Sequence, residues 1–185
     1  MKRKRFFVIL VSLISGLLIY IGANSIVDYP LLGENKSKEY IKEFITGHEG
    51  ELLPNIELLL PDSSTIINIA SIPSGKPTVL FYFGPYCEYC QLEMIEIVSN
   101  MRHMENIQFY LISPYHILDI RRFIDAYHLG KYPNITIGVD FKFKFGEYYK
   151  AKNIPYLAIY NSDKKLNAAF VGNVKYDQIK SISGK

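Results

Sequence analysis

The two cysteines of this chain, Cys87 and Cys90, lie three positions apart and directly follow the apolar run 77–83. Two cysteines placed at random over this length would show that spacing in roughly one case in a hundred. The run is typical of a buried strand, residues 84–86 of a short turn, and the residues after Cys87 of a helix. A thiol pair presented at a helix N-terminus can form a reversible disulfide. The sequence therefore predicts a fold organised around a strand, a turn, a redox dithiol and a helix.

The first 23 residues predict a membrane anchor. A basic cluster at 2–5 precedes residues 6–23, which carry no charge. As a helix these 18 residues would span about 27 Å, close to the roughly 30 Å hydrocarbon core of a bilayer. We expect 1–5 to be a cytoplasmic n-region, 6–23 a transmembrane anchor or uncleaved signal, and the remainder to lie outside the cytoplasm. Cleavage is the alternative, but Ile21 is a poor residue at the −3 position before Ala23.

The net charge of +3 reflects mainly that basic cluster. Without the four basic residues at 2–5, 17 basic residues face 18 acidic ones. The positive charge is therefore a signal for membrane topology. Because no other basic run with interleaved aromatic residues follows, we expect no nucleic-acid partner.

Residues 24–50 are assigned to a tether and 51–185 to a single domain of the usual size. Apolar residues at 40, 41, 44 and 45 have helical spacing, which predicts a short helix within the tether. In the domain, strands are predicted at 55–60, 65–69, 78–83, 107–112, 135–139, 156–160 and 166–171. Helices are predicted from Cys87 to 101, from Pro114 to Gly130, at 174–182, and at 140–151, where the alternation of 141–145 also fits a strand. Such an order predicts an α/β sandwich with a mixed sheet.

Two segments resemble the hallmarks of thioredoxin-fold proteins. Residues 79–90, VLFYFGPYCEYC, resemble their active-site segment, and residues 153–156, NIPY, resemble the loop whose cis-proline faces the dithiol. The leading hairpin, the extra strand–helix unit and the anchor are similar to the TlpA/ResA group of membrane-tethered bacterial thioredoxins. The resemblance covers roughly residues 52–185. It implies a thioredoxin-like three-layer α/β/α sandwich with a mixed sheet, preceded by one transmembrane helix.

The chain departs from that group at two positions beside the dithiol. Tyr86 stands where these proteins usually carry Trp, and Tyr89 stands where the ResA type has Pro. Many thioredoxins also use a buried acid in proton transfer. The candidates for it in this sequence are Glu57 and Glu88.

The expected chemistry is thiol–disulfide exchange without a cofactor. A thiolate at Cys87 would be stabilised by the helix N-terminus and would attack a client disulfide, and Cys90 would resolve the mixed disulfide. Glu88 opposes thiolate formation and supplies no positive charge to stabilise the reduced form, which favours a reductant. The expected partners are a disulfide-containing or dithiol client protein, a membrane thiol electron donor and the bacterial inner membrane. An apocytochrome, as in cytochrome c biogenesis, an oxidised surface protein or a copper-site cysteine pair would each fit as client.

Five residues are candidates for substrate binding. A cis bond before Pro155 would turn the backbone of Ile154 towards a client strand. Tyr86, Tyr89 and Tyr156 would border the groove, although each would equally fit a half-buried aromatic residue.

The cysteine pair also has several other interpretations. A structural disulfide would close a very small loop and stabilise little. Zinc would need further paired ligands, and haem attachment would need His at the position of Gln91. A copper-delivery protein could use both cysteines with His116 or His128. A peroxiredoxin carries Thr where this chain has Gly84. An oxidising, disulfide-forming member of the same fold also remains open.

Overall fold

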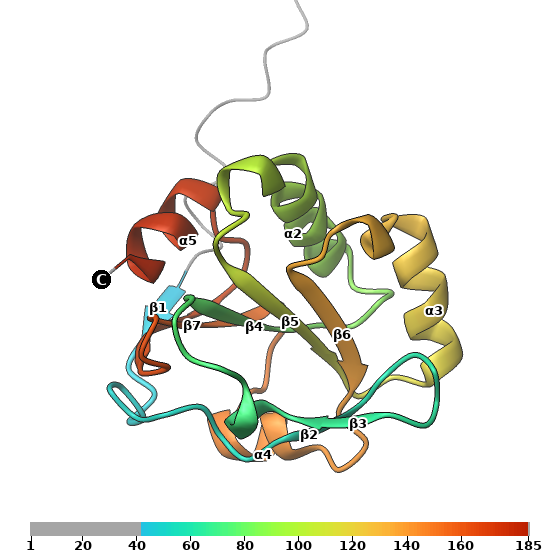
Figure 1. Cartoon of the computed structure of the whole chain (residues 1–185), viewed down its shortest axis with the longest axis horizontal. Helices are drawn as coiled ribbons and strands as arrows, with labels where there is room; N and C mark the ends of the chain where they lie inside the picture. The colour runs from blue at the N-terminus through green and yellow to red at the C-terminus, as the bar shows by residue number, and fades with distance from the viewer. Residues whose placement is uncertain (1–41, 185) are drawn as a thin grey trace, which may run out of the picture. The chain divides into compact units, whose positions relative to one another are not determined.

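An eight-stranded mixed sheet forms the centre of the computed structural model, which describes residues 42–184 (Figure 1). The strand order is β1-β8-β7-β4-β5-β6-β2-β3. β4, β5 and β6 run parallel, and every other pairing is antiparallel. The strands are β1 (Lys42–Phe44), β2 (Glu57–Leu59), β3 (Ile66–Asn68), β4 (Thr78–Tyr82), β5 (Gln108–Ser113), β6 (Ile135–Val139), β7 (Tyr156–Tyr160) and β8 (Leu166–Val171).

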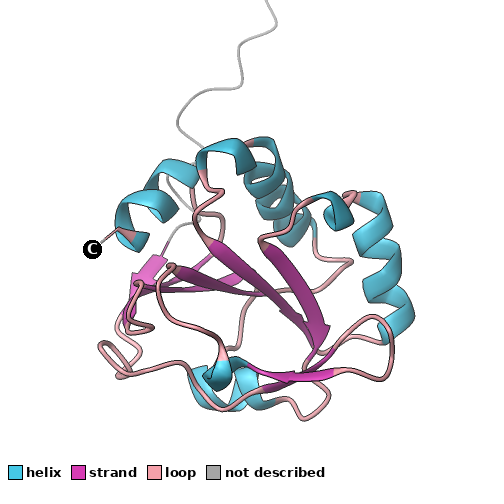
Figure 2. Ribbon diagram, in the orientation of Figure 1, coloured by secondary structure: helices cyan, strands magenta, loops and turns pink. Residues whose placement is uncertain are grey.

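Helices cover both faces of the sheet (Figure 2). Figure 1 shows three helices above the sheet, α2 (Glu88–Ser99), α3 (Ile117–Ala126) and α5 (Tyr176–Ser183), and α4 (Lys144–Tyr149) below it. Three short 3₁₀ helices lie at Ile69–Ser71, Met101–His103 and Leu129–Lys131. This arrangement confirms the predicted three-layer α/β/α sandwich. Within residues 42–184 no helix is long and apolar enough to span a membrane, and the predicted anchor at 6–23 lies outside the described residues.

The central strand β4 is buried on both faces, as its continuous apolar run predicts. Side chains alternate along a strand, so Val79 and Phe81 pack in the cluster beneath α2, α3 and α5. Leu80 and Tyr82 pack in the second cluster, against α4. The Tyr82 ring stacks on Phe145 of α4 at 4.5 Å between centroids. The two clusters hold the three layers together.

The prediction of a short helix in the tether is wrong for residues 42–44. These residues form strand β1, in which Lys42 pairs with Val171 and Phe44 with Ala169 of β8. Backbone hydrogen bonds at a sheet edge therefore override the helical spacing of a few apolar residues. The helix predicted at 140–151 is confirmed in a shorter form, because Phe143 and Lys150 adopt left-handed backbone conformations at its two ends.

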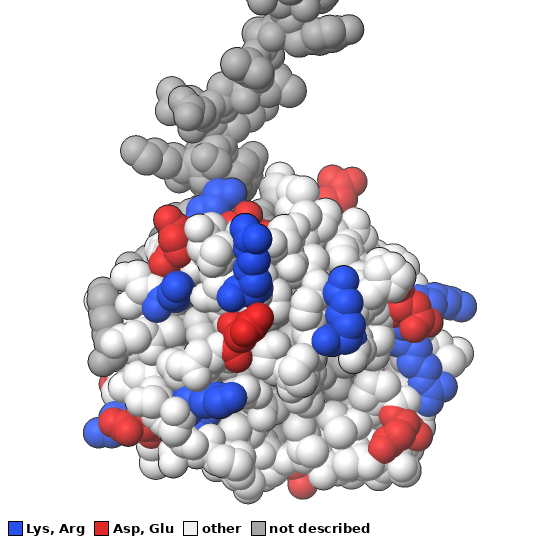
Figure 3. Space-filling model, turned by 45° about the horizontal axis from the view of Figure 1, so that its top comes forward, with Lys and Arg blue, Asp and Glu red and all other residues white. Residues whose placement is uncertain are grey.

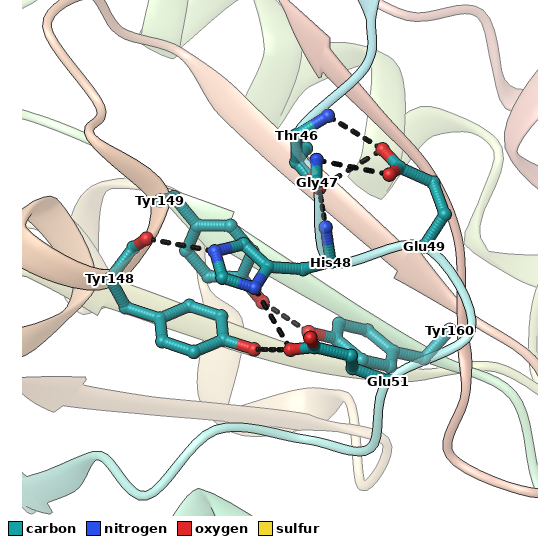
Figure 4. A network of polar contacts seen from close by, with 8 residues as sticks. All are labelled: Thr46, Gly47, His48, Glu49, Glu51, Tyr148, Tyr149 and Tyr160. Atoms are coloured by element: carbon teal, nitrogen blue, oxygen red, sulfur yellow. Dashed lines mark hydrogen bonds and ion pairs between the residues drawn. The ribbon is translucent and has the colours of Figure 1, made fainter.

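Residues 46–51, at the end of the predicted tether, pack against α4 (Figure 4). The His48 ring stacks on Tyr148 at 4.1 Å, and its Nε2 lies 3.2 Å from the Tyr148 carbonyl oxygen. Glu51 Oε2 accepts a hydrogen bond from the Tyr148 hydroxyl at 2.8 Å and lies 2.9 Å from His48 Nδ1. Beneath them, the hydroxyls of Tyr149 and Tyr160 bond to each other in the core. The packed domain thus includes residues that precede position 51.

Gly138 of β6 offers a test of how closely the β2–β3 hairpin packs on the sheet. A Cβ at this position would lie 2.9 Å from Leu58 Cβ and 3.2 Å from the Leu59 carbonyl oxygen. Gly138→Ala should therefore lower the free energy of unfolding by about 1–3 kcal/mol, measured by urea denaturation. Gly130→Ala is the matched control, because a Cβ there meets nothing within 4 Å. Equal stability of the two variants would contradict this packing.

Candidate active site

The dithiol lies where the central strand passes into α2. Cys87 is the N-cap residue of this helix, and its sulfur accepts a hydrogen bond from the Cys90 backbone N–H at 3.4 Å. The Cys87 N–H donates to the Gly84 carbonyl at 3.1 Å, which closes the turn after β4. Both cysteines are free thiols. A thiolate at Cys87 would face the unpaired N–H groups of the first helical turn, as the sequence predicts.

The two thiols differ in burial. Cys87 is partly exposed, whereas Cys90, in the first turn of α2, is fully buried. Burial raises the pKa of Cys90, and its interaction with the Cys87 side chain raises it further. Cys90 is therefore held as a neutral thiol inside, while a client can reach Cys87. This difference suits a nucleophile at Cys87 and a resolving thiol at Cys90.

The Ile154–Pro155 peptide bond is cis, as the sequence predicts. Tyr156 of β7 pairs with Tyr82 of β4, which places the start of β7 beside the turn that carries the dithiol. The Cys87 sulfur lies 4.0 Å from the Ile154 carbonyl oxygen. The backbone of Ile154 therefore borders the Cys87 sulfur.

The glycine of the turn keeps this region open. A Cβ on Gly84 would lie 3.0 Å from Ile154 Cδ1 and 3.3 Å from Tyr115 Cε2. Tyr115 follows β5, whose parallel register with β4 brings it to the same edge of the sheet. Tyr115 is a wall of the site that the sequence reasoning did not identify.

Two of the three candidate tyrosines lie on the rim. Tyr86 is 63% exposed, its hydroxyl donates to Asp119 Oδ1 at 2.6 Å, and its ring meets Tyr115 edge-on at 6.0 Å. Tyr89, between the cysteines, is 44% exposed. The prediction for Tyr156 is wrong, because this residue is 1% exposed and packs on the α4 side of the sheet, 5.4 Å from Phe145. Strand alternation directs its ring away from the dithiol.

A cleft of about 240 Å³ lies beside the dithiol, between the start of α2 and α3. Its walls are largely apolar, and a paired acid and base, Asp119 and Arg122, lie at its edge with 3.3 Å between Oδ1 and Nη1. This cleft offers room for a client side chain near Cys87. Its other lining residues are Pro85, Tyr86, Gln91, Phe123, Ala126 and Tyr127.

The buried acid is Glu93, and neither Glu57 nor Glu88 occupies such a position. Glu88 is exposed in the first turn of α2, and Glu57 forms an ion pair with Lys142 at the far edge of the sheet. Glu93 lies on α2 one turn after Cys90 and is fully buried. The available signal was its spacing from Cys90, because 90, 93, 94 and 97 form the inward face of this helix.

The Glu93 carboxyl is held asymmetrically. Its Oε2 accepts hydrogen bonds from the Val174 backbone N–H at 2.8 Å and from Asn173 Nδ2 at 3.2 Å. Its Oε1 has no hydrogen-bond partner among residues 42–184. Burial raises the pKa of Glu93 to about 8, and the two hydrogen bonds oppose this increase. A carboxyl that exchanges protons near neutral pH is suited to acid–base work.

His116 and His128 are the histidines considered as copper ligands. His116 caps α3, where its Nδ1 accepts from the Leu118 N–H at 3.3 Å, and His128 precedes a 3₁₀ helix in a left-handed conformation. In the part of the chain that the structure describes, no three His, Cys, Asp or Glu side chains are arranged to hold a metal ion.

The burial of Glu93 predicts a pH dependence of stability. Its pKa is about 4.5 when unperturbed and about 8 in the fold, so between these values the folded state retains a proton that the unfolded chain has released. The free energy of unfolding should fall as pH rises through this range, by about 1.4 kcal/mol for each unit of pKa difference, and the loss should be complete above the folded pKa.

Glu93→Gln should lose this slope and gain stability relative to the unsubstituted chain as the solution becomes alkaline, measured by urea unfolding over a pH series. Glu105→Gln, which changes an exposed carboxylate, is the control and should keep the slope. An unchanged slope in Glu93→Gln would show that Glu93 is ionised throughout.

Comparisons with known proteins agree with this geometry. The chain resembles StoA from Bacillus subtilis, with 17% sequence identity and a TM-score of 0.54 over 71% of this chain and 96% of that one. It also resembles a secreted disulfide oxidoreductase of Mycobacterium tuberculosis homologous to E. coli DsbE, with 22% identity and a TM-score of 0.54 over 70% of this chain and 92% of that one. A third similar structure is the thioredoxin domain of a thiol-disulfide oxidoreductase from Bacteroides vulgatus, with 15% identity and a TM-score of 0.55 over 72% of this chain and 93% of that one. At these identities the likeness establishes the fold. No curated protein matches the chain.

The family model described as AhpC/TSA matches residues 50–171, about two thirds of the chain. The match spans the central strand, both cysteines, the cis-proline and the strand that follows it. With its thioredoxin-like sheet and its dithiol at the start of α2, the chain belongs to the AhpC/TSA family.

Proposed function

We propose that the protein is a membrane-anchored, extracytoplasmic thiol–disulfide oxidoreductase that reduces disulfides of client proteins. The observation that carries this proposal is the pairing of a partly exposed Cys87 at a helix N-terminus with a buried Cys90 one turn later. The cis Ile154–Pro155 bond beside Cys87 supports it, because it leaves a backbone edge next to the reacting sulfur.

The exchange proceeds in two steps. The Cys87 thiolate attacks one sulfur of the client disulfide, so a Cys87–client disulfide forms and the other client sulfur leaves as a thiolate. Cys90 then attacks the Cys87 sulfur, and the second client sulfur leaves with the electron pair. The client gains two electrons and takes two protons from solvent, and the protein is left with a Cys87–Cys90 disulfide. A membrane thiol donor would return the two electrons.

Glu93 would supply the base for the second step. Cys90 must lose its proton before it attacks, and burial makes this deprotonation unfavourable. The Glu93 carboxyl lies one turn further along α2 and titrates near pH 8. In its ionised form it can take the proton from the Cys90 thiol as Cys90 attacks, so that no free thiolate has to form in the buried site.

Glu88 supports the reducing direction. It lies in the first turn of α2 next to Cys87, so its negative charge disfavours the reduced form with a thiolate at Cys87. Strong oxidants stabilise their reduced form, and Glu88 does the opposite. The preference is modest, because 30 mV corresponds to about 1.4 kcal/mol for this couple.

The anchor expected at 6–23 supports a location outside the cytoplasm, at the bacterial inner membrane. On the face shown in Figure 3, Lys and Arg side chains are interspersed with Asp and Glu among uncharged residues, so this face favours a protein client over a polyanion. A peroxidase is disfavoured because Gly84 stands where a peroxiredoxin carries Thr, and a Cβ at this position would lie only 3.0 Å from Ile154 Cδ1.

Two cysteine variants test the roles of the thiols. Cys87→Ser should abolish disulfide exchange, because the buried Cys90 cannot reach a client. Cys90→Ser should accumulate mixed disulfides with clients, since nothing resolves them. Both can be read from non-reducing gels of cells that express the full chain. Full exchange by Cys87→Ser would overturn the assignment.

The reduction potential tests the direction. The full-length chain in detergent would be equilibrated with glutathione or dithiothreitol buffers, and the thiols counted by mass after alkylation. A value near or below about −270 mV is expected for a reductant. A value near about −120 mV would identify an oxidant instead. If Cys87 and Cys90 formed no reversible dithiol–disulfide couple, the proposed oxidoreductase activity would be wrong.

A further inference from the structure

Asn173 joins the turn between the cysteines to the buried acid. It lies in the loop from β8 to α5, and its Nδ2 donates to the Tyr89 carbonyl oxygen at 2.7 Å and to Glu93 Oε2 at 3.2 Å. An amide nitrogen carries two hydrogens, so each acceptor can have its own. The neighbouring Val174 N–H donates to the same Glu93 oxygen at 2.8 Å. One loop thereby contacts both Tyr89, between the two thiols, and the carboxyl that would serve Cys90.

These donors act on the charged form of the acid. A hydrogen bond to a carboxylate favours ionisation, whereas burial favours the neutral acid. The charged and titratable groups that act on Glu93 are Cys90 and Glu96 on its own helix and Lys175 at the start of α5. The Lys175 ammonium is 3.5 Å from Glu96 Oε2, so its charge is shared with that neighbour. The close donors to the carboxyl are therefore Asn173 and the Val174 N–H.

We propose that Asn173 is a positioning residue that keeps the Glu93 carboxyl available as the base for Cys90. This proposal rests on the proposed function. In the step concerned, the proton passes from the Cys90 sulfur to the Glu93 carboxylate. The Cys90 sulfur bonds to the Cys87 sulfur, and the bond between Cys87 and its partner sulfur breaks. The electron pair leaves on that partner sulfur. Asn173 takes no part in the attack by Cys87.

A purely mechanical role for Asn173 gives different expectations. The Val174 N–H already ties the loop to Glu93, so the loop does not need a second contact to that oxygen. If Asn173 only stabilised the loop, its loss would lower the melting temperature and leave the pH profile of exchange unchanged. If it acts through Glu93, its loss changes one half-reaction and its pH midpoint.

The experiment follows the two half-reactions with 5,5′-dithiobis(2-nitrobenzoate), using the reduced full-length chain in detergent. Attack by Cys87 releases the first thionitrobenzoate, and attack by Cys90 on the mixed disulfide releases the second. In Asn173→Ala the first release should keep its rate. The second should slow about tenfold near neutral pH, because one hydrogen bond to a charged group is lost, and its midpoint should move to higher pH.

Asn167→Ala is the matched control. Asn167 of β8 also donates from Nδ2 to a carbonyl oxygen, that of Ile182 in α5, at 2.9 Å, but it does not bond Glu93. Its loss should leave both releases unchanged. Asn173→Asp keeps the shape of the side chain and adds a second carboxyl beside Glu93, so it should also slow the second release if Asn173→Ala fails to fold.

A double variant separates the possible failures. In Glu93→Gln the second release should be slow, and adding Asn173→Ala should slow it no further. An additive effect in this background would overturn the role of Asn173, as would an unchanged second release and pH midpoint in either Asn173 variant. If the unsubstituted chain released no second thionitrobenzoate at all, the proposed dithiol function itself would be wrong.

Discussion

The fold depends on a central strand that is buried on both faces and paired on both edges. β4 pairs in parallel with β5 and antiparallel with β7, and all five of its residues are buried. Because any shift would break its pairing with both neighbours and its packing in both hydrophobic clusters, its end is a stable platform for the turn that follows. The register of its neighbours then brings Tyr115 and Ile154 to the same edge as Cys87. The site is therefore built by strand register, with short loops completing it.

Local patterns were sufficient to predict most of this framework. The run 78–83, the turn and the helix after Cys87 follow one another in sequence, so no distant contact was needed to recognise them. The same holds for the hairpins at β2–β3 and β7–β8, whose turns are short. The cis-proline was predicted through resemblance, because nothing in an Ile-Pro pair alone specifies the isomer.

The residues whose positions were predicted wrongly are those that depend on tertiary contacts. Glu93 looks like an exposed acid in a helix until the β8–α5 loop covers it with two donors from residues 80 and 81 positions further along the chain. Tyr156 follows the proline immediately, but strand alternation turns it to the other face. Likewise, residues 42–44 become a strand because β8 offers them a free edge. The spacing of Glu93 from Cys90 indicates that it faces inward, but a single sequence does not identify the distant loop or strand that these residues contact.

If the proposed anchor at 6–23 is correct, the start of the sheet at Lys42 sets a limit on the distance between the dithiol and the membrane. With residues 6–23 as the anchor, the pairing of Lys42 with Val171 leaves only 24–41 to link the membrane and the folded domain. Eighteen residues can extend over at most about 65 Å, where the 27 residues of the tether as first assigned would have allowed about 95 Å. The two thiols would then stay within that distance of the bilayer surface. Under the proposed function, client proteins held at that surface would therefore be at a higher effective concentration than clients that diffuse freely.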